Sequence, residues 1–167
     1  RKPRRFKARA NHRFAVIISA RNEQAVIGQL LDSINEQNYP SELVDTFVVA
    51  DNCTDNTAGV AAEHGAYVYV RNDKRHVGKG YALNFIFRII YSEYADRHYE
   101  GFFVFDADNI LDKNYIAEMN SVFDNGYRIV TSYRNSKNYD DNWISAASSL
   151  WFLREARYLN NSRMILG

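Results

Sequence analysis

Two aspartates close an apolar run and are the first candidates for chemistry. Asp106 and Asp108 follow Phe102-Phe103-Val104-Phe105, which predicts a buried strand. Alternate residues of an extended chain share a face, so the two carboxylates can point the same way. Hard divalent cations prefer oxygen ligands and relieve the repulsion between such carboxylates. We therefore predict a metal and diphosphate clamp. The alternative is that one aspartate caps a turn while the other is solvated.

A third carboxylate follows another predicted strand. Asp51 comes directly after Val48-Val49-Ala50 and opens the segment Asp51-Asn52-Cys53-Thr54-Asp55. Its carboxylate can accept a hydrogen bond from a base N–H or a ribose hydroxyl. The alternative is a turn residue, a role that aspartate fills well. We interpret Asp51 as a nucleotide contact and Asp55 as structural.

The segment after the first apolar run, Phe14-Ala15-Val16-Ile17-Ile18, is also polar. Glu23 could hydrogen-bond a nucleoside, with the small Ala20 keeping the approach open. Alternatively, Glu23 is a first-turn glutamate that interacts favourably with a helix dipole. Arg21 is either a phosphate or ribose contact or plain surface charge.

Lys79 lies between Gly78 and Gly80 at a predicted helix start. Glycine permits close backbone approach, helix N-terminal amides attract anions, and lysine adds a positive charge. The spacing is not that of a P-loop, because the eight-residue motif and its Lys-Ser/Thr pair are missing. We predict a phosphate or nucleotide contact, with a flexible surface loop as the alternative.

Apolar runs alternate with helical patterns along the chain, which predicts an α/β fold. We expect a mostly parallel, Rossmann-like sheet of about five strands with helices on both faces and ligands beyond the carboxyl ends of the strands. Expected strands are 14–18, 44–50, 66–70, 102–105 and 128–133. Expected N-terminal caps are Asn22 for the first helix, Asn52 or Thr54 for the second, and Asp112 for the fourth. The second, third and fourth helices are expected to end at Gly65, about Tyr94 and Gly126. A last helix is expected at about 143–159.

Composition favours one domain with a hydrophobic core. The chain has 167 residues, of which 46% are hydrophobic and 25% charged. The single cysteine, Cys53, excludes an internal disulfide framework and fits a reducing compartment. No apolar run approaches the ~18–20 residues needed to span a bilayer.

The net charge of +1 hides an asymmetry. Residues 1–13 carry seven basic side chains and no acidic one, which leaves 14 basic and 20 acidic side chains in the remainder. A basic arm ahead of an acidic domain suggests an anionic membrane surface or nucleic acid, and the alternative is a solvated leader.

These motifs together resemble the family 2 glycosyltransferases with the GT-A fold. The resemblance rests on four segments in the family's order and covers about residues 14–167. The segments are Ser19-Ala20-Arg21-Asn22-Glu23, Val48-Val49-Ala50-Asp51-Asn52-Cys53-Thr54-Asp55, Lys79-Gly80-Tyr81-Ala82-Leu83-Asn84 and Phe105-Asp106-Ala107-Asp108. The chain looks like the membrane-bound or processive branch, which includes cellulose, hyaluronan and poly-N-acetylglucosamine synthases.

The resemblance implies a role for each matching residue. Ala20, Glu23 and Asp51 would hold uridine, with Arg21 nearby, and Lys79 would lie near the base or the diphosphate. Asp106 would touch the ribose or sugar, Ala107 would lie between the two aspartates, and Asp108 would bind Mn²⁺ or Mg²⁺ with help from Asp106. Such enzymes transfer a sugar from a UDP-sugar to an acceptor hydroxyl with inversion.

The resemblance also sets expectations for a parent protein. Ser19 stands where the family usually has proline, and the family's acidic base motif and Gln-x-x-Arg-Trp motif do not appear, so we expect the catalytic base beyond Gly167. The chain would be the donor-binding half, residues 14–167, behind a basic arm, residues 1–13. We expect a saccharide or lipid-linked acceptor, the cytoplasmic face of the membrane, no nucleic acid and possible oligomers.

Two other classes compete with a sugar transferase. A haloacid dehalogenase-type phosphohydrolase also places Asp-x-Asp after a strand, but near its N-terminus and with Thr or Val at set positions. Here Asn109-Ile110 follow the motif and three predicted strands precede it. A non-catalytic nucleotide-binding module is the other alternative.

Overall fold

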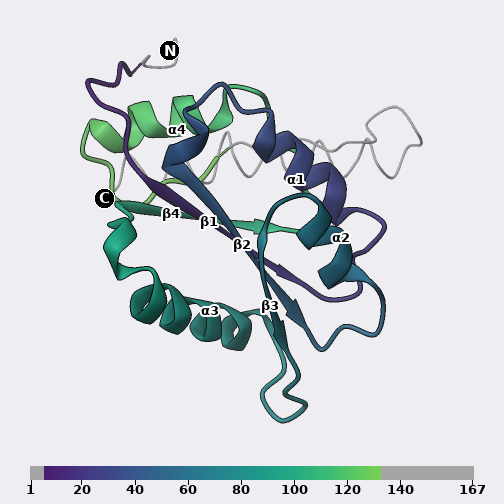
Figure 1. Ribbon diagram of the computed structural model, residues 1–167. Helices are drawn as coiled ribbons and strands as arrows, with labels where there is room; N and C mark the ends of the chain where they lie inside the picture. Colours follow the sequence, from purple (N-terminus) through teal and green to yellow (C-terminus); the bar gives the residue numbers. More distant parts are fainter. Residues whose placement is uncertain (1–5, 133–167) are drawn as a thin grey trace, which may run out of the picture. The chain divides into compact units, whose positions relative to one another are not determined.

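The structure, a computed structural model, describes residues 6–132 (Figure 1). Residues 6–127 form one compact unit, and residues 128–132 belong to a second. The strands are β1 Phe14–Ala20, β2 Val44–Asp51, β3 Tyr67–Arg71 and β4 Gly101–Asp106. The helices are α1 Ile27–Asn35, α2 Thr57–Glu63, α3 Lys79–Glu93 and α4 Tyr115–Asp124, with 3₁₀ turns η1 Ser41–Leu43 and η2 Ala95–Arg97.

The strands form one parallel sheet in the order β3-β2-β1-β4. β1 is central and pairs with β2 and β4, with Phe14 opposite both Val44 and Gly101. A parallel sheet needs crossover connections, and the helices supply them. The predicted α/β architecture is therefore confirmed.

The described residues contain four strands, so the predicted count of five is wrong for this part of the chain. Residues 128–132 have neither helical nor strand backbone, and Ile129 is 91% exposed. The apolar run here is only Ile129-Val130, and so short a run buries little surface to stabilise a strand. Tyr133 and the helix expected at 143–159 lie outside the described residues.

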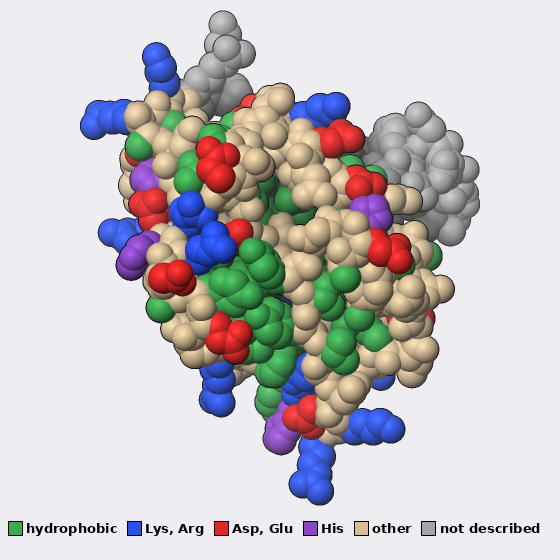
Figure 2. All heavy atoms as spheres, in the orientation of Figure 1, with side chains coloured by type: hydrophobic (Ala, Val, Ile, Leu, Met, Phe, Trp, Pro, Cys, Tyr) green, Lys and Arg blue, Asp and Glu red, His purple; other side chains and the backbone are tan. Residues whose placement is uncertain are grey.

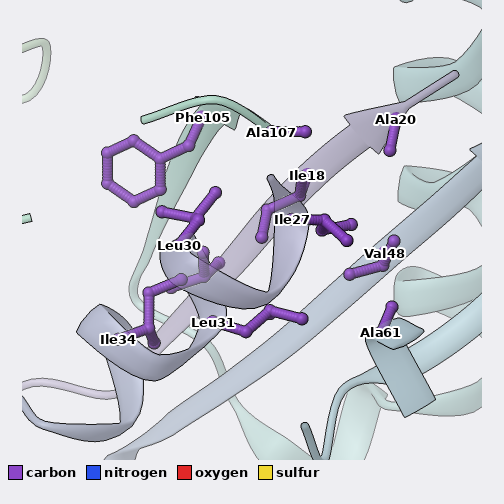
Figure 3. Packing of buried hydrophobic residues seen from close by; sticks show 11 residues of the cluster. Ile18, Ala20, Ile27, Leu30, Leu31, Ile34, Val48, Ala61, Phe105 and Ala107 are labelled. Carbon is purple, nitrogen blue, oxygen red and sulfur yellow. The ribbon is translucent and has the colours of Figure 1, made fainter. Parts of the chain in front are cut away.

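One face of the sheet packs against α1 and α2. Val16, Ile18 and Ala20 alternate along β1 and point to this face, as a strand's two-residue period requires. Figure 3 shows the α1 side chains lying over β1 and Ala61 of α2 lying close to Val48 of β2; the α1 residues are Ile27, Leu30, Leu31 and Ile34. The continuous apolar run of β1 follows, because Ala15 and Ile17 are buried on the opposite face.

The opposite face packs against α3 (Figure 1). Ala82, Ile86 and Ile90 recur every four residues along α3 and contact Ile17 and other residues of β1 and β2. Figure 2 shows apolar side chains gathered over the region between α3 and β3, amid interspersed basic and acidic side chains. The packing fixes α3, and hence its first residue Lys79, against the sheet.

The predicted N-terminal caps of two helices are wrong. α1 begins at Ile27, after Val26, and no side chain caps it. Asn22 instead adopts a left-handed backbone, with φ 57°, and its Oδ1 accepts hydrogen bonds from Thr54. α2 likewise begins at Thr57, beyond both Asn52 and Thr54. The polar residues after β1 and β2 therefore bind each other's loops, because the two parallel strands end side by side.

The later helix boundaries agree more closely with the sequence. α3 ends at Glu93, and Gly65 and Gly126 follow α2 and α4 with φ of 84° and 94°. Asp112 does not occupy the cap position of α4, which is Asn114, but its Oδ1 accepts the Asn114 N–H at 2.9 Å. Among the described residues, no helix combines the length and the apolar character that a membrane span requires.

Candidate functional site

The predicted site residues gather at the carboxyl edge of the sheet. Ala20 lies opposite Ala50, and Asp106 lies opposite Ser19, so β1, β2 and β4 end at the same level. Asp51 follows Ala50 and lies opposite Arg71, the last residue of β3. Four strand ends therefore place two carboxylates and a guanidinium along one edge, where open parallel sheets bind ligands.

Lys79 and Asp106 form an ion pair across this edge. The Lys79 ammonium donates a hydrogen bond to Asp106 Oδ1, although the residues lie 27 positions apart. Lys79 is the first residue of α3 and Asp106 is the last of β4, so the packing of α3 on the sheet brings them together. Both side chains remain about half exposed, at 43% and 48%. The pair is accessible to a ligand, and the lysine supplies a cation beside the carboxylate.

Asp108 lies outside the strand. β4 ends at Asp106, and the Asn109 N–H donates to the Asp106 carbonyl at 3.1 Å, which closes a turn. The strand alternation that we used to align the two carboxylates is therefore wrong beyond Asp106. Asp108 is exposed, and its Oδ1 accepts a hydrogen bond from the Asn109 side chain at 3.2 Å. The turn still keeps both aspartates at the end of one strand.

Asp51 is buried and paired with Arg71. Its Oδ1 accepts hydrogen bonds from Arg71 Nη1 at 2.6 Å and from the Asn52 side chain at 3.0 Å. The two charged side chains are only 8% and 9% exposed. A buried carboxylate needs such a partner, because an unpaired charge is costly in the interior. Within the described residues no hydrogen bond reaches Asp51 Oδ2, which stays available as an acceptor.

Arg71 also holds the loop that leads to Lys79. Its Nη2 donates to Asp73 Oδ2 at 3.1 Å and to the His76 carbonyl at 2.7 Å. Hydrogen bonds from the His76 ring and from backbone N–H groups of Arg75 and His76 lower the pKa of Asp73 to about 2. Arg71 thus links the carboxylate that ends β2 to the loop ahead of α3.

Arg71 was not predicted as a site residue. The available signal was an arginine that ends the apolar run Ala66-Tyr67-Val68-Tyr69-Val70, where a buried strand would meet the same edge as Asp51. Recognising it required the register between β2 and β3, which places Arg71 directly opposite Asp51.

The loop after β1 is held to the loop after β2. The Glu23 N–H donates to Thr57 Oγ1 at 2.8 Å, and the Glu23 carbonyl accepts from the N–H groups of Val26 and Ile27. Ala20 is 2% exposed, Glu23 is half-buried and Arg21 is exposed. The backbone of Glu23 is therefore fixed by structural contacts, while the Arg21 and Glu23 side chains remain beside the same edge.

Asp55 has the structural role that we predicted. Its carboxylate accepts hydrogen bonds from the Thr57 N–H and hydroxyl and from the Gln24 N–H. The Thr57 hydroxyl contributes most to the lowered pKa of Asp55. The residue holds the turn before α2 and ties it to the loop after β1.

The donor set at this edge fits a divalent cation that is shared with a phosphate ligand. Among the described residues, no three His, Cys, Asp or Glu side chains gather to bind a metal alone. Asp106 and Asp108 provide two carboxylates, and Mg²⁺ sites that use one or two carboxylates complete their coordination with phosphates and water. Asp106 already pairs with the Lys79 ammonium, so a bound cation would have to displace that ammonium or share the carboxylate with it.

A parallel sheet covered by helices on both faces, with charged side chains at its carboxyl edge, defines a doubly wound α/β protein. The sequence matches the family described as "Glycosyltransferase like family 2" over residues 12–164. The chain belongs to this family, and its fold is the Rossmann-like GT-A fold.

Solved structures share the fold at low sequence identity. TarS of Staphylococcus aureus in complex with UDP-GlcNAc has a TM-score of 0.56 and 20% identity, covering 75% of this chain and 41% of that one. The mannosyltransferase PcManGT of Pyrobaculum calidifontis, in complex with GDP-Man and Mn²⁺, has a TM-score of 0.55 and 24% identity, covering 72% of this chain and 36% of that one.

A curated relative is more similar over a shorter stretch. The 4,4'-diaponeurosporenoate glycosyltransferase of Staphylococcus aureus is 49% identical over 59 residues, which is 35% of this chain and 15% of that protein. This chain therefore spans a minor part of its relatives. The predicted cellulose, hyaluronan and poly-N-acetylglucosamine synthase branch stays a prediction.

Proposed function

We propose that this chain is the donor-binding region of an inverting glycosyltransferase that uses a UDP-sugar. The observation that supports this best is the gathering of Asp51, Lys79, Asp106 and Asp108 at one edge of a family 2 fold. The family match favours sugar transfer over a haloacid dehalogenase-type phosphohydrolase.

The nucleoside would bind beside the ends of β1 and β2. Asp51 Oδ2 is the acceptor for a base or ribose donor, because Oδ1 already bonds to Arg71 and Asn52. The small Ala20 would leave room for the ring, and the half-buried Glu23 and exposed Arg21 would line the approach. TarS in complex with UDP-GlcNAc supports uridine as the base, whereas PcManGT in complex with GDP-Man supports a nucleotide-sugar more generally.

The diphosphate would bind beside the ends of α3 and β4. Lys79 supplies a positive charge that can move from Asp106 to a phosphate oxygen, since the pair is half exposed. Asp106 and Asp108, with Ala107 between them, would hold Mn²⁺ or Mg²⁺. When bound, the cation would supply positive charge to the departing diphosphate. PcManGT, solved in complex with Mn²⁺, supports this choice of cation.

The acceptor of the sugar and the membrane location of a longer parent protein are also part of the proposed function. We propose a saccharide or lipid-linked acceptor, an acidic base beyond Gly167, and a parent at the cytoplasmic face of the membrane. The basic arm, residues 1–13, would lie near anionic lipid, and nucleic acid is not a proposed partner. A non-catalytic nucleotide-binding role is the second candidate, and only the parent's transfer activity separates it from the first.

Calorimetry of UDP binding tests the donor site. We expect the 167-residue chain to bind UDP with Mn²⁺ and at least tenfold more weakly in its absence. Asp108→Asn should remove this metal dependence, because the exposed Asp108 carboxylate is a proposed ligand. Glu63→Gln is the matched control, since Glu63 is an exposed carboxylate at the end of α2 and lies at neither proposed site.

Two outcomes would reject this assignment. UDP binding that is equally strong with and without metal would exclude the carboxylate clamp. Release of phosphate from small phosphomonoesters, without UDP binding, would instead favour a phosphohydrolase.

A further inference from the structure

A cavity of about 440 Å³ lies at the amino edge of the sheet, opposite the donor site. Arg13, Arg97, His98, Asp96 and Glu100 contribute to its lining. Arg13 and Glu100 directly precede β1 and β4, whose first residues pair with each other. β1 spans roughly 20 Å at ~3.3 Å per residue, so this cavity and the carboxyl edge are separate places.

Two guanidinium groups at the cavity lack strong partners. Arg13 Nη1 and Arg97 Nη1 lie 3.7 Å and 4.0 Å from the same atom, Asp45 Oδ2. That oxygen already accepts a hydrogen bond from the Tyr99 hydroxyl at 2.5 Å. Arg13 Nη1 is buried and has no hydrogen-bond partner among the described residues. A buried N–H group without an acceptor is uncommon and calls for a partner.

The neighbouring carboxylates do not meet this need. Glu100 accepts hydrogen bonds from the His12 ring at 2.8 Å and from the Arg13 backbone N–H at 3.2 Å. Asp96 is exposed, and within the described part of the chain neither guanidinium bonds to it. Arg13 and Arg97 thus line one cavity and share Asp45 as their ion-pair partner, and among the described residues neither guanidinium makes a hydrogen bond.

We propose that this cavity binds a phosphoryl group between Arg13 and Arg97. A guanidinium donates two parallel hydrogen bonds to a phosphate, and a phosphate has enough oxygens to accept from both arginines. The phosphate belongs either to a soluble phosphate ester or to a lipid headgroup, and both offer the same chemistry to the cavity.

Inorganic phosphate is the probe for the site itself. Amide NMR spectra of the 167-residue chain are recorded during a phosphate titration without divalent metal, at ionic strength held constant with chloride. We expect saturable shifts at Arg13, Arg97, His98 and Glu100, in a pattern distinct from any shifts at the carboxyl edge. The absence of saturable shifts at this amino edge would overturn the proposal.

Matched variants connect the binding to the arginines. Arg97→Gln should weaken phosphate binding at least tenfold, and Arg13→Lys should weaken it several-fold, because lysine keeps the charge but loses the fork. Arg88→Gln, which removes an exposed arginine on α3, should bind phosphate as tightly as the unsubstituted chain. Equal phosphate binding by Arg97→Gln and by the unsubstituted chain would contradict the proposal.

Vesicle sedimentation identifies the source of the phosphate. Sedimentation with phosphatidic acid vesicles, absent with phosphatidylcholine and lost in Arg97→Gln, would assign a lipid headgroup. Phosphate binding in solution without such sedimentation would assign a soluble phosphate ester. Failure of both probes would exclude the site, and UDP binding at the opposite edge would remain a separate measurement.

Discussion

At the scale of single residues, the pair of Asp51 and Arg71 connects stability to the proposed site. The two charged side chains are buried and joined by a 2.6 Å hydrogen bond. Arg71 also bonds to Asp73 and to the His76 carbonyl, so it fixes both the nucleoside carboxylate and the loop before Lys79. Arg71 is therefore a positioning residue, whereas Asp51 is the proposed contact.

Arg71→Met tests this assignment. The substitution would leave the Asp51 carboxylate buried without its partner, so we expect the free energy of unfolding to fall by about 3–5 kcal/mol. Urea unfolding measures the loss. Adding Asp51→Asn to Arg71→Met should recover part of it, because the uncompensated charge is then removed. Two single losses that simply add in the double variant would contradict the pairing.

Lys79→Gln separates binding from stability. The ion pair with Asp106 is about half exposed, so its loss should change the free energy of unfolding by less than about 1 kcal/mol. UDP affinity should fall about tenfold, a difference of about 1.4 kcal/mol in binding free energy, because a cation beside the diphosphate is lost. Calorimetry and urea unfolding measure the two effects. A large stability loss with unchanged UDP affinity would make Lys79 structural.

The sequence predicted which residues carry chemistry better than it predicted which residues they bind. Asp51 and Asp106 were found because each carboxylate follows an apolar run at a strand end. The partner of Asp51 was missed, because pairing with Arg71 depends on how β2 and β3 align. The turn that contains Asp108 was predicted only as the alternative to a shared strand face, since strand spacing cannot show where a strand stops.

At the scale of elements, the described part of the basic arm is attached to α4. The Arg9 N–H donates to Asp124, and the His12 N–H donates to Asn120. The His12 ring contacts Glu100 Oε2 at 2.8 Å and Asp124 Oδ1 at 2.9 Å. The chain is therefore fixed to the domain at Arg9 and His12, while the Arg9 side chain stays exposed.

The His12 contacts make the attachment dependent on pH. Hydrogen bonds to Glu100 and Asp124 raise the pKa of His12 above 6.5. The His12 ring lowers the pKa of Glu100, and the Arg9 N–H, followed by the His12 ring, lowers the pKa of Asp124. The stabilising effect of protonated His12 is complete below pH 6.5 and is lost as pH rises through the raised pKa. The carboxylates act oppositely, because their contribution is lost as pH falls through their lowered pKa values.

His12→Asn is the test of this pH dependence. We expect the variant to lower Tm by about 2–6 °C near pH 6, where all three groups are charged, and by less near pH 9. Thermal unfolding of both chains across this range measures the difference. A Tm difference that stays constant between pH 6 and pH 9 would show that His12 acts through packing alone.

Element types were predicted more accurately than element boundaries. Four strands and the four helices between and after them follow from apolar periodicity, which the core retains in β1 and α3. The starts of α1 and α2 were wrong, because Asn22 and Thr54 bond to each other across neighbouring loops instead of capping their own helices. Such contacts depend on tertiary structure.

At the scale of the whole molecule, the two edges of the sheet carry different chemistry. The carboxyl edge has Asp51, Lys79 and Asp106, and the amino edge has the attached arm and two arginines beside a cavity. The family match over residues 12–164 agrees with the resemblance found in the sequence, although relatives are considerably longer than this chain.

The central claim is that the carboxyl edge binds a cation together with a nucleoside diphosphate. Amide NMR spectra with UDP and substoichiometric Mn²⁺ test it directly, because the paramagnetic ion broadens nearby signals. We predict the strongest broadening at Asp106, Ala107 and Asp108 and at Lys79, and the weakest at Arg97 and His98 across the sheet. Broadening centred on any other surface, or no change on adding UDP, would contradict the account.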